Sequence, residues 1–341
     1  MSTHRVDVIE VLLEQHPNAD TLSVVKAFDY PVVVKTSEWK NGDLGAYIPP
    51  DSIVPTDGVF AFLGGQTRVR ARKFRGIQSF GLLVKAPDGA QAGDDVAEVL
   101  GVTHYEPATM GKTSGECVRA PRIKAPRRDD NQILENVEFS VPVYDLEAFR
   151  RYTNAFENGE DVQITEKIHG TNSRFVFYDG EMYCGSRKEW KKQHDQNLWW
   201  VALAQNPWME TLCHENEGTV FFAETYGWVQ NLKYGEGVGK YKIKIFDVFR
   251  DGRFLDLTEI WSVFGWGKPG GHVNDWMWVP VLYNGQFQKD IVYSLSTGNS
   301  IASTEPQIRE GCVVRPVKER FDRRIGRVIL KEVSPEYLEA N

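Results

Sequence analysis

The stretch from residue 162 to residue 172, Val-Gln-Ile-Thr-Glu-Lys-Ile-His-Gly-Thr-Asn, decides how the rest of the chain is interpreted. Val162 and Ile164 alternate with polar residues, which predicts a short β-strand. Lys167 follows, and Gly170 allows the backbone to turn or to approach a ligand closely. A lysine at such a strand end can point into a pocket, where desolvation and neighbouring cations would lower its pKa and make it a nucleophile. Taken alone, the segment fits a surface lysine before a polar turn better, and only the residues downstream reverse this interpretation.

The composition is that of a soluble protein with more than one domain. The 341 residues suffice for two domains, and 41% hydrophobic residues can build sizeable cores. We expect no membrane span, because no run of about 18 uncharged apolar residues occurs. The first residues lack the apolar core of a signal peptide, and four widely spaced cysteines argue against zinc sites and disulfides, which together predict a cytoplasmic protein. The net charge of −7 argues against indiscriminate binding of polyanions but permits a local basic groove.

Residues 1–105 are predicted to form an all-β domain. Short apolar runs alternate there with turn-forming clusters of Pro, Asn, Asp and Gly, a pattern typical of a small barrel. The segment from His16 to Leu22, followed by alternating residues 23–27, resembles the tRNA-binding OB domain appended to some aminoacyl-tRNA synthetases. Such barrels commonly bind nucleic acid strands on one face. The expected strands are Val6–Leu13, Leu22–Phe28, Tyr30–Thr36, Gly45–Ile48 and Gly81–Lys85.

A strongly basic stretch, Thr67-Arg68-Val69-Arg70-Ala71-Arg72-Lys73-Phe74-Arg75, lies near the end of this predicted domain. Its five cations and one aromatic residue fit a ribbon or loop that contacts phosphates. A solvated charged strand fits the same composition equally well, because a run of charges alone decides little. Both interpretations stay open at the level of the sequence.

Residues 106–145 are predicted to form a basic linker, because residues 118–128 combine two prolines with several cations and lack apolar periodicity. From residue 146 to residue 341 the pattern is mixed. Residues 197–205 show helical spacing, and Asn206-Pro207 is typical of an N-cap and first residue of a second helix. The expected fold class is therefore α+β, with a barrel followed by a domain of antiparallel sheets and flanking helices. The strand-like runs of this domain are Ser173–Tyr178, Val220–Thr225, Lys242–Val248, Gly311–Pro316 and Arg327–Glu332.

Charged residues lie within or beside several of these apolar strands. Glu224 is part of Phe-Phe-Ala-Glu-Thr-Tyr-Gly, Asp247 is part of Ile-Phe-Asp-Val-Phe, and Glu310 begins Glu-Gly-Cys-Val-Val-Arg. A carboxylate in an apolar strand is costly unless it is paired or bound to a metal. Arg187 follows a Gly-Ser pair, and Lys331 ends the run Val-Ile-Leu-Lys. Three such carboxylates, together with these two cations and the lysine of the first segment, predict one shared site.

The order Lys-x-His-Gly, Ser-Arg, Phe-x-Glu, Phe-Asp, Glu-Gly-x-Val and a terminal strand lysine resembles the covalent nucleotidyltransferase superfamily of ligases and capping enzymes. Within it, Glu-Lys-Ile-His-Gly-Thr-Asn looks like the nick-sealing RNA ligases, whereas DNA ligases and capping enzymes usually carry aspartate at the place of His169. A barrel before the catalytic domain is similar to small RNA-repair ligases, so the resemblance covers essentially the whole chain. The last motif departs from the usual two lysines separated by one residue, since Ile329 precedes Lys331. Either Lys331 acts alone or a cation such as Arg327 substitutes.

The resemblance implies an ATP-dependent RNA ligase that seals 5′-phosphate/3′-hydroxyl breaks in duplex RNA. Lys167 would attack the α-phosphate of ATP to form lysyl-AMP, AMP would pass to the 5′-phosphate of a nick, and the adjacent 3′-hydroxyl would displace it. Such transfers need positioning and charge neutralisation more than acid–base groups. The implied cofactors are ATP and Mg²⁺ or Mn²⁺, the implied partner is a nicked or broken RNA duplex or an RNA/DNA hybrid, and a monomer is expected.

The resemblance also assigns roles to individual residues. The implied catalytic residues are Lys167, Glu224, Glu310 and Lys331. The implied contacts to ATP or AMP are Glu166, Lys167, Ile168, Arg187, Glu224, Phe246 and Lys331. The RNA 5′-phosphate would be bound by Asn172 and Arg187, and the metal would be reached, directly or through water, by Glu224, Asp247 and Glu310. Phe246 would stack on adenine, although a position in the core explains it equally well.

Two alternatives stay open, namely a DNA ligase or mRNA capping guanylyltransferase, and a non-catalytic RNA-binding protein that uses the barrel and the basic linker. Enzymes of the first kind normally carry an OB domain after the last motif. Only ten residues follow Lys331, so we expect an RNA ligase rather than either of them. Covalent labelling by ATP would distinguish the enzymes from a binding protein.

Overall fold

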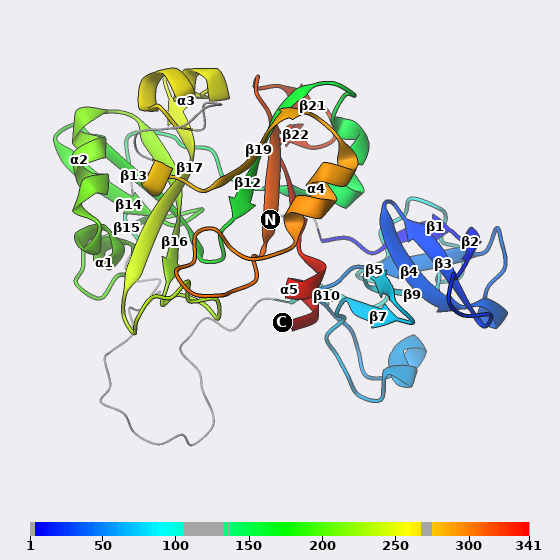
Figure 1. Cartoon of the computed structure of the whole chain (residues 1–341). Coiled ribbons are helices and arrows are strands. Elements are labelled where there is room, and N and C mark those ends of the chain that lie inside the picture. The colour runs from blue at the N-terminus through cyan, green and yellow to red at the C-terminus, as the bar shows by residue number, and fades with distance from the viewer. Residues whose placement is uncertain (1–3, 106–132, 136, 267–274, 341) are drawn as a thin grey trace. The chain divides into compact units, whose positions relative to one another are not determined.

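The computed structural model of the chain (Figure 1) divides into two compact units. The structure describes residues 4–105, 133–135, 137–266 and 275–340. Of these, residues 4–105, 146–154 and 333–340 make up the first unit, and all others make up the second. The predicted linker at residues 106–145 lies mostly outside the described residues, and its basic segment, 118–128, lies wholly outside them.

The first unit is a small, mainly β fold, as the short apolar runs predict, together with the short helix α5 (Pro335–Ala340). Its strands are β1 (Asp7–Glu10), β2 (Leu13–Gln15), β3 (Leu22–Ala27), β4 (Tyr30–Lys35), β5 (Leu44–Ile48), β6 (Ser52–Ile53), β7 (Arg72–Phe74), β8 (Ile77–Ser79), β9 (Leu82–Lys85), β10 (Thr103–His104) and β11 (Glu147–Ala148). One antiparallel sheet has the order β1-β5-β9, and another has the order β2-β3-β4. β5 separates two hydrophobic clusters, because Ala46 and Ile48 pack into one and Tyr47 into the other.

The first unit also takes in residues 146–154, which the sequence pattern assigns to the second domain. The guanidinium of Arg150 lies 4.5 Å from the centre of the Phe80 ring. Arg151 forms an ion pair with the buried carboxylate of Asp7. The boundary thus differs from the predicted one, because it depends on long-range contacts of two arginines that hydrophobic periodicity does not show.

The second unit is built on two antiparallel sheets. Its strands are β12 (Asp161–Lys167), β13 (Thr171–Tyr178), β14 (Glu181–Gly185), β15 (Trp190–Lys191), β16 (Val220–Gly227), β17 (Tyr241–Arg250), β18 (Arg253–Phe254), β19 (Val281–Gln286), β20 (Gly311–Pro316), β21 (Phe321–Asp322), β22 (Gly326–Arg327) and β23 (Leu330–Val333). The first sheet has the order β15-β14-β13-β16-β17-β18, and the second contains β23-β20-β12-β19 in that order. The α-helices of the chain are α1 (Leu198–Gln205), α2 (Pro207–Glu215), α3 (Leu257–Phe264), α4 (Lys289–Ser296) and α5 (Pro335–Ala340). The 3-10 helices are η1 (Thr36–Glu38), η2 (Gly58–Leu63), η4 (Phe149–Arg151), η5 (Thr153–Ala155) and η6 (Asp275–Met277).

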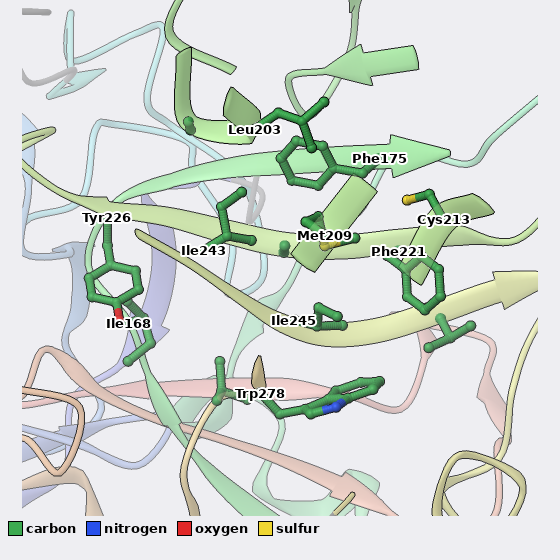
Figure 2. Packing of buried hydrophobic residues seen from close by; sticks show 14 of the residues in the cluster. Ile168, Phe175, Leu203, Met209, Cys213, Phe221, Tyr226, Ile243, Ile245 and Trp278 are labelled. Carbon is green, nitrogen blue, oxygen red and sulfur yellow. The ribbon is translucent and has the colours of Figure 1, made fainter. Parts of the chain in front are cut away.

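One large hydrophobic core fills the space between α1, α2 and the six-stranded sheet. Figure 2 shows part of this core, including Phe175 from β13, Phe221 from β16 and Ile245 from β17. Side chains on a strand alternate between the two faces of its sheet, and these three residues all project toward the core. Their neighbours in each strand therefore project from the opposite face. None of the described helices is long and apolar enough to cross a membrane.

Most predicted elements of the second unit are present, with two differences. The Asn206 side chain does not cap α2 but donates hydrogen bonds to the carbonyls of Ala202 and Tyr241, at 2.7 and 3.0 Å. The predicted strand Arg327–Glu332 is split into β22 and β23. The cause is a turn in which the Ile329 N–H donates to the Arg327 carbonyl at 2.9 Å.

The turn between β12 and β13 requires glycine at position 170 because another strand passes close by. A Cβ atom added to Gly170 would lie 2.2 Å from the carbonyl oxygen of Thr225 on β16. Since real Cβ atoms do not approach an oxygen so closely, any larger residue must displace β16 from β13. The glycine therefore holds the end of the lysine strand against the six-stranded sheet.

We predict that Gly170→Ala destabilises the protein by about 2 kcal/mol, the usual cost of overpacking a tight contact. The measurement is the free energy of unfolding from urea denaturation. The matched control is Gly237→Ala, where the added Cβ would meet only Lys240 Cγ at 3.9 Å. Equal urea midpoints of unfolding for Gly170→Ala and Gly237→Ala would contradict the close approach of the Thr225 carbonyl to Gly170.

Candidate active site

The site is built around Lys167, the last residue of β12. β12 and β20 pair antiparallel with Lys167 opposite Gly311, and this register places the preceding residue, Glu310, beside the lysine. Lys167 Nζ lies 2.7 Å from Glu310 Oε1. The side chains are 23% and 11% exposed, so the ion pair sits in a recess that still reaches solvent.

Carboxylates dominate the electrostatics of this lysine. Burial alone would lower the pKa of Lys167, but the negative charges of Glu310 and Glu224 outweigh it and raise the pKa. Burial would likewise raise the pKa of Glu310, but Lys167 and His169 lower it to about 2. The expectation that neighbouring cations lower the pKa of Lys167 is therefore wrong for the ligand-free protein, because acidic groups surround the amine.

His169 connects the acidic side of the site to a loop that the sequence did not single out. Its Nε2 lies 2.7 Å from Asn231 Oδ1, and its Nδ1 lies 3.5 Å from Glu310 Oε2. Its backbone N–H donates to the hydroxyl of buried Tyr234 at 2.6 Å. Asn231 and Tyr234 lie in a stretch without periodicity or motif, so no sequence signal indicated them. His169 thus lies between Asn231 and Glu310, and we propose that it orients the Glu310 carboxylate.

Three polar side chains share the face of the six-stranded sheet that is turned away from the hydrophobic core. Asn172 on β13 lies opposite Glu224 on β16, which in turn lies opposite Lys244 on β17. Directly paired residues project from the same face, so the three form a row. Lys244 was not predicted, although its alternation with the core residues Ile243 and Ile245 indicates this face.

The members of this row differ in their surroundings. Asn172 Oδ1 is buried and accepts no hydrogen bond from the described residues. Lys244 Nζ donates to the Trp276 carbonyl at 2.8 Å, and burial lowers the pKa of Lys244 despite the opposing charges of Glu166 and Asp275. A buried amide oxygen and a destabilised ammonium beside Glu224 are groups that a polar ligand would satisfy.

The two neighbours of Lys167 in the chain support the strand end. The carboxylate of Glu166 accepts hydrogen bonds from Ser300 Oγ at 2.5 Å and from the Ile301 N–H at 2.8 Å. Ile168 is 4% exposed and belongs to the hydrophobic core. Both side chains are engaged within the protein, which argues against the predicted direct side-chain contacts to a nucleotide.

Asp247 lies at the centre of a buried ion-pair network. Its Oδ1 is 3.0 Å from Arg315 Nη1, and its Oδ2 is 2.9 Å from Arg327 Nη2 and accepts from the Tyr144 hydroxyl at 2.8 Å. Both arginines also pair with Glu319. Burial opposes ionisation, but the two arginines lower the pKa of Asp247. This geometry argues against the predicted metal contact, because both carboxylate oxygens of Asp247 are bound to protein side chains. It also argues against Arg327 as a substitute phosphate ligand, because its guanidinium is paired with Asp247 and Glu319.

Three further predicted residues lie in different surroundings. Arg187 Nη1 pairs with Asp145 Oδ1 at 2.9 Å, and both side chains are partly exposed. Phe246 lies at a β-bulge between β16 and β17, with its ring centre 4.9 Å from that of Tyr144. Lys331 is half-buried on β23, the neighbour of β20 in the second sheet.

The acidic groups of the site fit a metal that is held jointly by protein and substrate. No group of three or more His, Cys, Asp or Glu side chains among the described residues could hold a metal by itself. Glu310 Oε2, however, is buried and lies 3.5 Å from His169 Nδ1, too far for a good hydrogen bond, and Glu224 acts on the same lysine from the other sheet. Mg²⁺ is commonly bound by one or two carboxylates together with waters and substrate phosphates.

Comparison with known proteins identifies the family. The family model of RNA ligases matches residues 160–333, more than half of the 341-residue chain. The chain belongs to the RNA ligase family. The matched segment contains Lys167, Glu224, Glu310 and Lys331. A second model, that of an OB-fold domain, matches residues 4–86 in the first unit and confirms the predicted barrel in front of the ligase domain.

Solved structures of RNA ligase share this arrangement of domains. A lysine-to-alanine variant of Naegleria gruberi RNA ligase with ATP and Mn is 21% identical, covers 98% of both chains and has a TM-score of 0.76. An arginine-to-alanine variant with ATP and Mn is 22% identical, covers 99% of both chains and also has a TM-score of 0.76. At this identity the likeness establishes the fold. No curated protein sequence matches the chain significantly.

We predict that Asp247→Asn destabilises the ligase by about 3 to 5 kcal/mol, because it leaves two buried arginines without their counter-charge. Urea denaturation measures the effect. The matched control is Asp322→Asn, which removes the half-buried partner of exposed Arg324 and should change stability far less. Unchanged stability of Asp247→Asn, with weaker metal binding, would instead support the metal contact.

A second prediction concerns the Lys167–Glu310 pair. Glu310→Gln removes the charge that raises the pKa of Lys167, so burial should then dominate and the pKa should fall. An amine-modifying reagent reacts only with the neutral amine, and peptide mass spectrometry can follow modification of each lysine against pH. The midpoint for Lys167 should move to lower pH in Glu310→Gln, while exposed Lys192 serves as the internal control. An unchanged midpoint for Lys167 would show that Glu310 does not control its charge.

Proposed function

We propose that the protein is an ATP-dependent ligase that seals breaks with a 5′-phosphate and a 3′-hydroxyl in duplex RNA. The observation that carries this proposal is the placement of Lys167 at a strand end, against Glu310 on one sheet and within the field of Glu224 on the other. A family of RNA ligases that act through a lysine requires a recessed amine beside groups able to manage phosphate charge. The Naegleria structures with ATP and Mn support the choice of nucleotide and metal.

In the first step, the neutral amine of Lys167 attacks the α-phosphorus of ATP. A nitrogen–phosphorus bond forms, the bond to the leaving oxygen breaks, and pyrophosphate departs. Only the unprotonated amine is nucleophilic, and burial favours that form once a ligand compensates the charges of Glu310 and Glu224. Mg²⁺ or Mn²⁺, when bound at these carboxylates, would supply neutralisation of the phosphate charge.

The next two steps transfer AMP and close the break. An oxygen of the RNA 5′-phosphate attacks the phosphorus of lysyl-AMP, and Lys167 leaves as the amine. The 3′-hydroxyl then attacks the 5′-phosphate, the phosphodiester forms, and AMP departs. We propose that Asn172 and Arg187 hold the 5′-phosphate. The buried, unsatisfied Oδ1 of Asn172 and the partly exposed guanidinium of Arg187 support this assignment.

Lys331 is proposed to hold the α-phosphate as the single lysine of its motif. Ile329, which stands where a first lysine is usual, is 5% exposed, and Arg327 is bound to Asp247 and Glu319. Neither residue can therefore replace the missing cation. Lys244, beside Glu224, is the better candidate for a second positive charge near the phosphates, and Phe246 is proposed to contact the adenine.

We predict that wild-type protein incubated with α-³²P-ATP retains the label through an acid-labile bond, and that Lys167→Ala abolishes labelling because the attacking amine is lost. Exposed Lys192→Ala is the matched control and should label normally. Circular dichroism establishes that each variant is folded.

Three outcomes would redirect the proposal. Label on Lys167→Ala would exclude this lysine as the nucleophile. Labelling by GTP but not by ATP would support a capping guanylyltransferase. Absence of any labelling, with RNA binding intact, would support a non-catalytic RNA-binding protein. Sealing of matched nicks with RNA or DNA on each side of the break then defines the duplex that is used.

A further inference from the structure

The first unit carries a short hairpin with an unusual residue at its tip. We call β7, β8 and the two residues between them the basic hairpin. Phe74 pairs with Ile77, so the connecting loop is only Arg75-Gly76. Their φ angles are 46° and 92°, and positive values at both loop residues indicate a type I′ turn. Glycine, asparagine and aspartate favour such a turn, whereas arginine is strained there, and strained residues cluster at functional sites.

The tip of the hairpin is held from behind by two side chains of the His-Pro-Asn segment. Asn18 Nδ2 donates to the Arg75 carbonyl at 2.9 Å. His16, which is 1% exposed, has its Nε2 3.2 Å from the Phe74 carbonyl. His16 Nδ1 accepts the Asn18 N–H at 3.1 Å, so the ring carries its hydrogen on Nε2 and donates it to Phe74. We call this pair of side chains the brace, and it fixes the carbonyl groups of two successive residues at the tip.

The outer surface of the hairpin combines cations with an aromatic ring. Arg70, Arg72, Lys73, Phe74 and Arg75 are all exposed, and no acidic residue occurs between positions 67 and 80. The Phe74 side chain is 39% exposed, although an aromatic residue of a small fold is normally buried. In a chain with a net charge of −7, such a patch is a local exception.

The alternation of side chains along a strand divides the patch. Arg72 and Phe74 project to one side of the hairpin, and Lys73 projects to the other. Arg75 lies in the two-residue loop at the tip. Arg72, on the same side as Phe74, and Arg75, next to Phe74 in sequence, thus place two exposed cations close to an exposed aromatic ring, the combination that single-stranded nucleic acid sites use.

From these observations we infer that the basic hairpin binds a strand of RNA, with Arg72 and Arg75 on phosphates and Phe74 stacked on a base. The brace holds the tip in its strained conformation before RNA arrives, which lowers the conformational entropy lost on binding. Phosphate alone would need only the cations, whereas the exposed ring adds the platform that unpaired bases use. The choice of RNA as the ligand rests on the proposed function.

The experiment measures the affinity of the full-length protein for a fluorescein-labelled single-stranded RNA by fluorescence anisotropy at several salt concentrations. Arg75→Gly removes a phosphate contact and should weaken binding about tenfold, with the slope of log K against log salt reduced by about 0.7. Glycine adopts positive φ without strain, so this variant should melt no lower than the wild type. Phe74→Ala should also weaken binding about tenfold, but with an unchanged salt slope.

Two further variants distinguish a specific RNA-binding site from nonspecific electrostatic attraction of RNA. Lys73→Ala removes the same charge as Arg75→Gly from the same hairpin, but at a residue that projects from the side opposite Phe74, and should weaken binding much less. Asn18→Ala removes half of the brace without changing any charge, and should weaken binding with an unchanged salt slope.

Equal losses for Lys73→Ala and Arg75→Gly, with no effect of Phe74→Ala, would overturn the inference and leave only diffuse electrostatics. Displacement of the RNA by polyglutamate of equal charge would equally overturn it in favour of an acidic protein partner. The labelling of wild-type protein by ATP is measured separately. Labelling together with unaffected RNA binding by the hairpin variants would refute this inference alone, and hairpin-dependent RNA binding without labelling would refute the proposed ligase activity alone.

Discussion

The contact between Lys167 and Glu310 is the constraint on which the rest of the site depends. It brings together residues far apart in the chain, and it exists because β12 and β20 pair in one particular register. A slip of one residue between these strands would turn Glu310 to the other face of the sheet and leave a recessed ammonium without its counter-charge. The buried support of Glu166 and Ile168, and the lack of space beside Gly170, each hold the strand end in that register.

Each of the two sheets contributes both an acidic and a basic side chain to the candidate site. One sheet supplies the lysine and Glu310, and the other supplies Glu224, Asn172 and Lys244 in a row. The carboxylates raise the pKa of Lys167 and so favour its protonated form. In the proposed function, a nucleotide with its metal would bring charges that replace this ion pair at Glu310 and Glu224.

The sequence predicted most of the elements because strands depend on local patterns, whereas the roles of the site residues came from the resemblance to a family and stay predictions. Strands appear as short apolar runs, and a carboxylate inside such a run indicates a partner. It could not predict which partner. Glu224 and Asp247 look alike in sequence, yet Asp247 meets Arg315 and Arg327 and is structural. His169 likewise needs Asn231, from a loop without any pattern. The prediction of a lowered pKa for Lys167 was wrong for the same reason. The direction in which a pKa moves depends on the charged neighbours that the fold brings to the group.

The network around Asp247 has a mechanical consequence for the ligase domain. Asp247 belongs to β17 of the six-stranded sheet, whereas Arg315 belongs to β20 of the other sheet. Their contact is therefore a buried ion pair that links the two sheets. Sheets joined in this way cannot shear past one another without separating desolvated charges, a motion with a steep energetic barrier. The halves of the domain should consequently unfold together, as a single cooperative block.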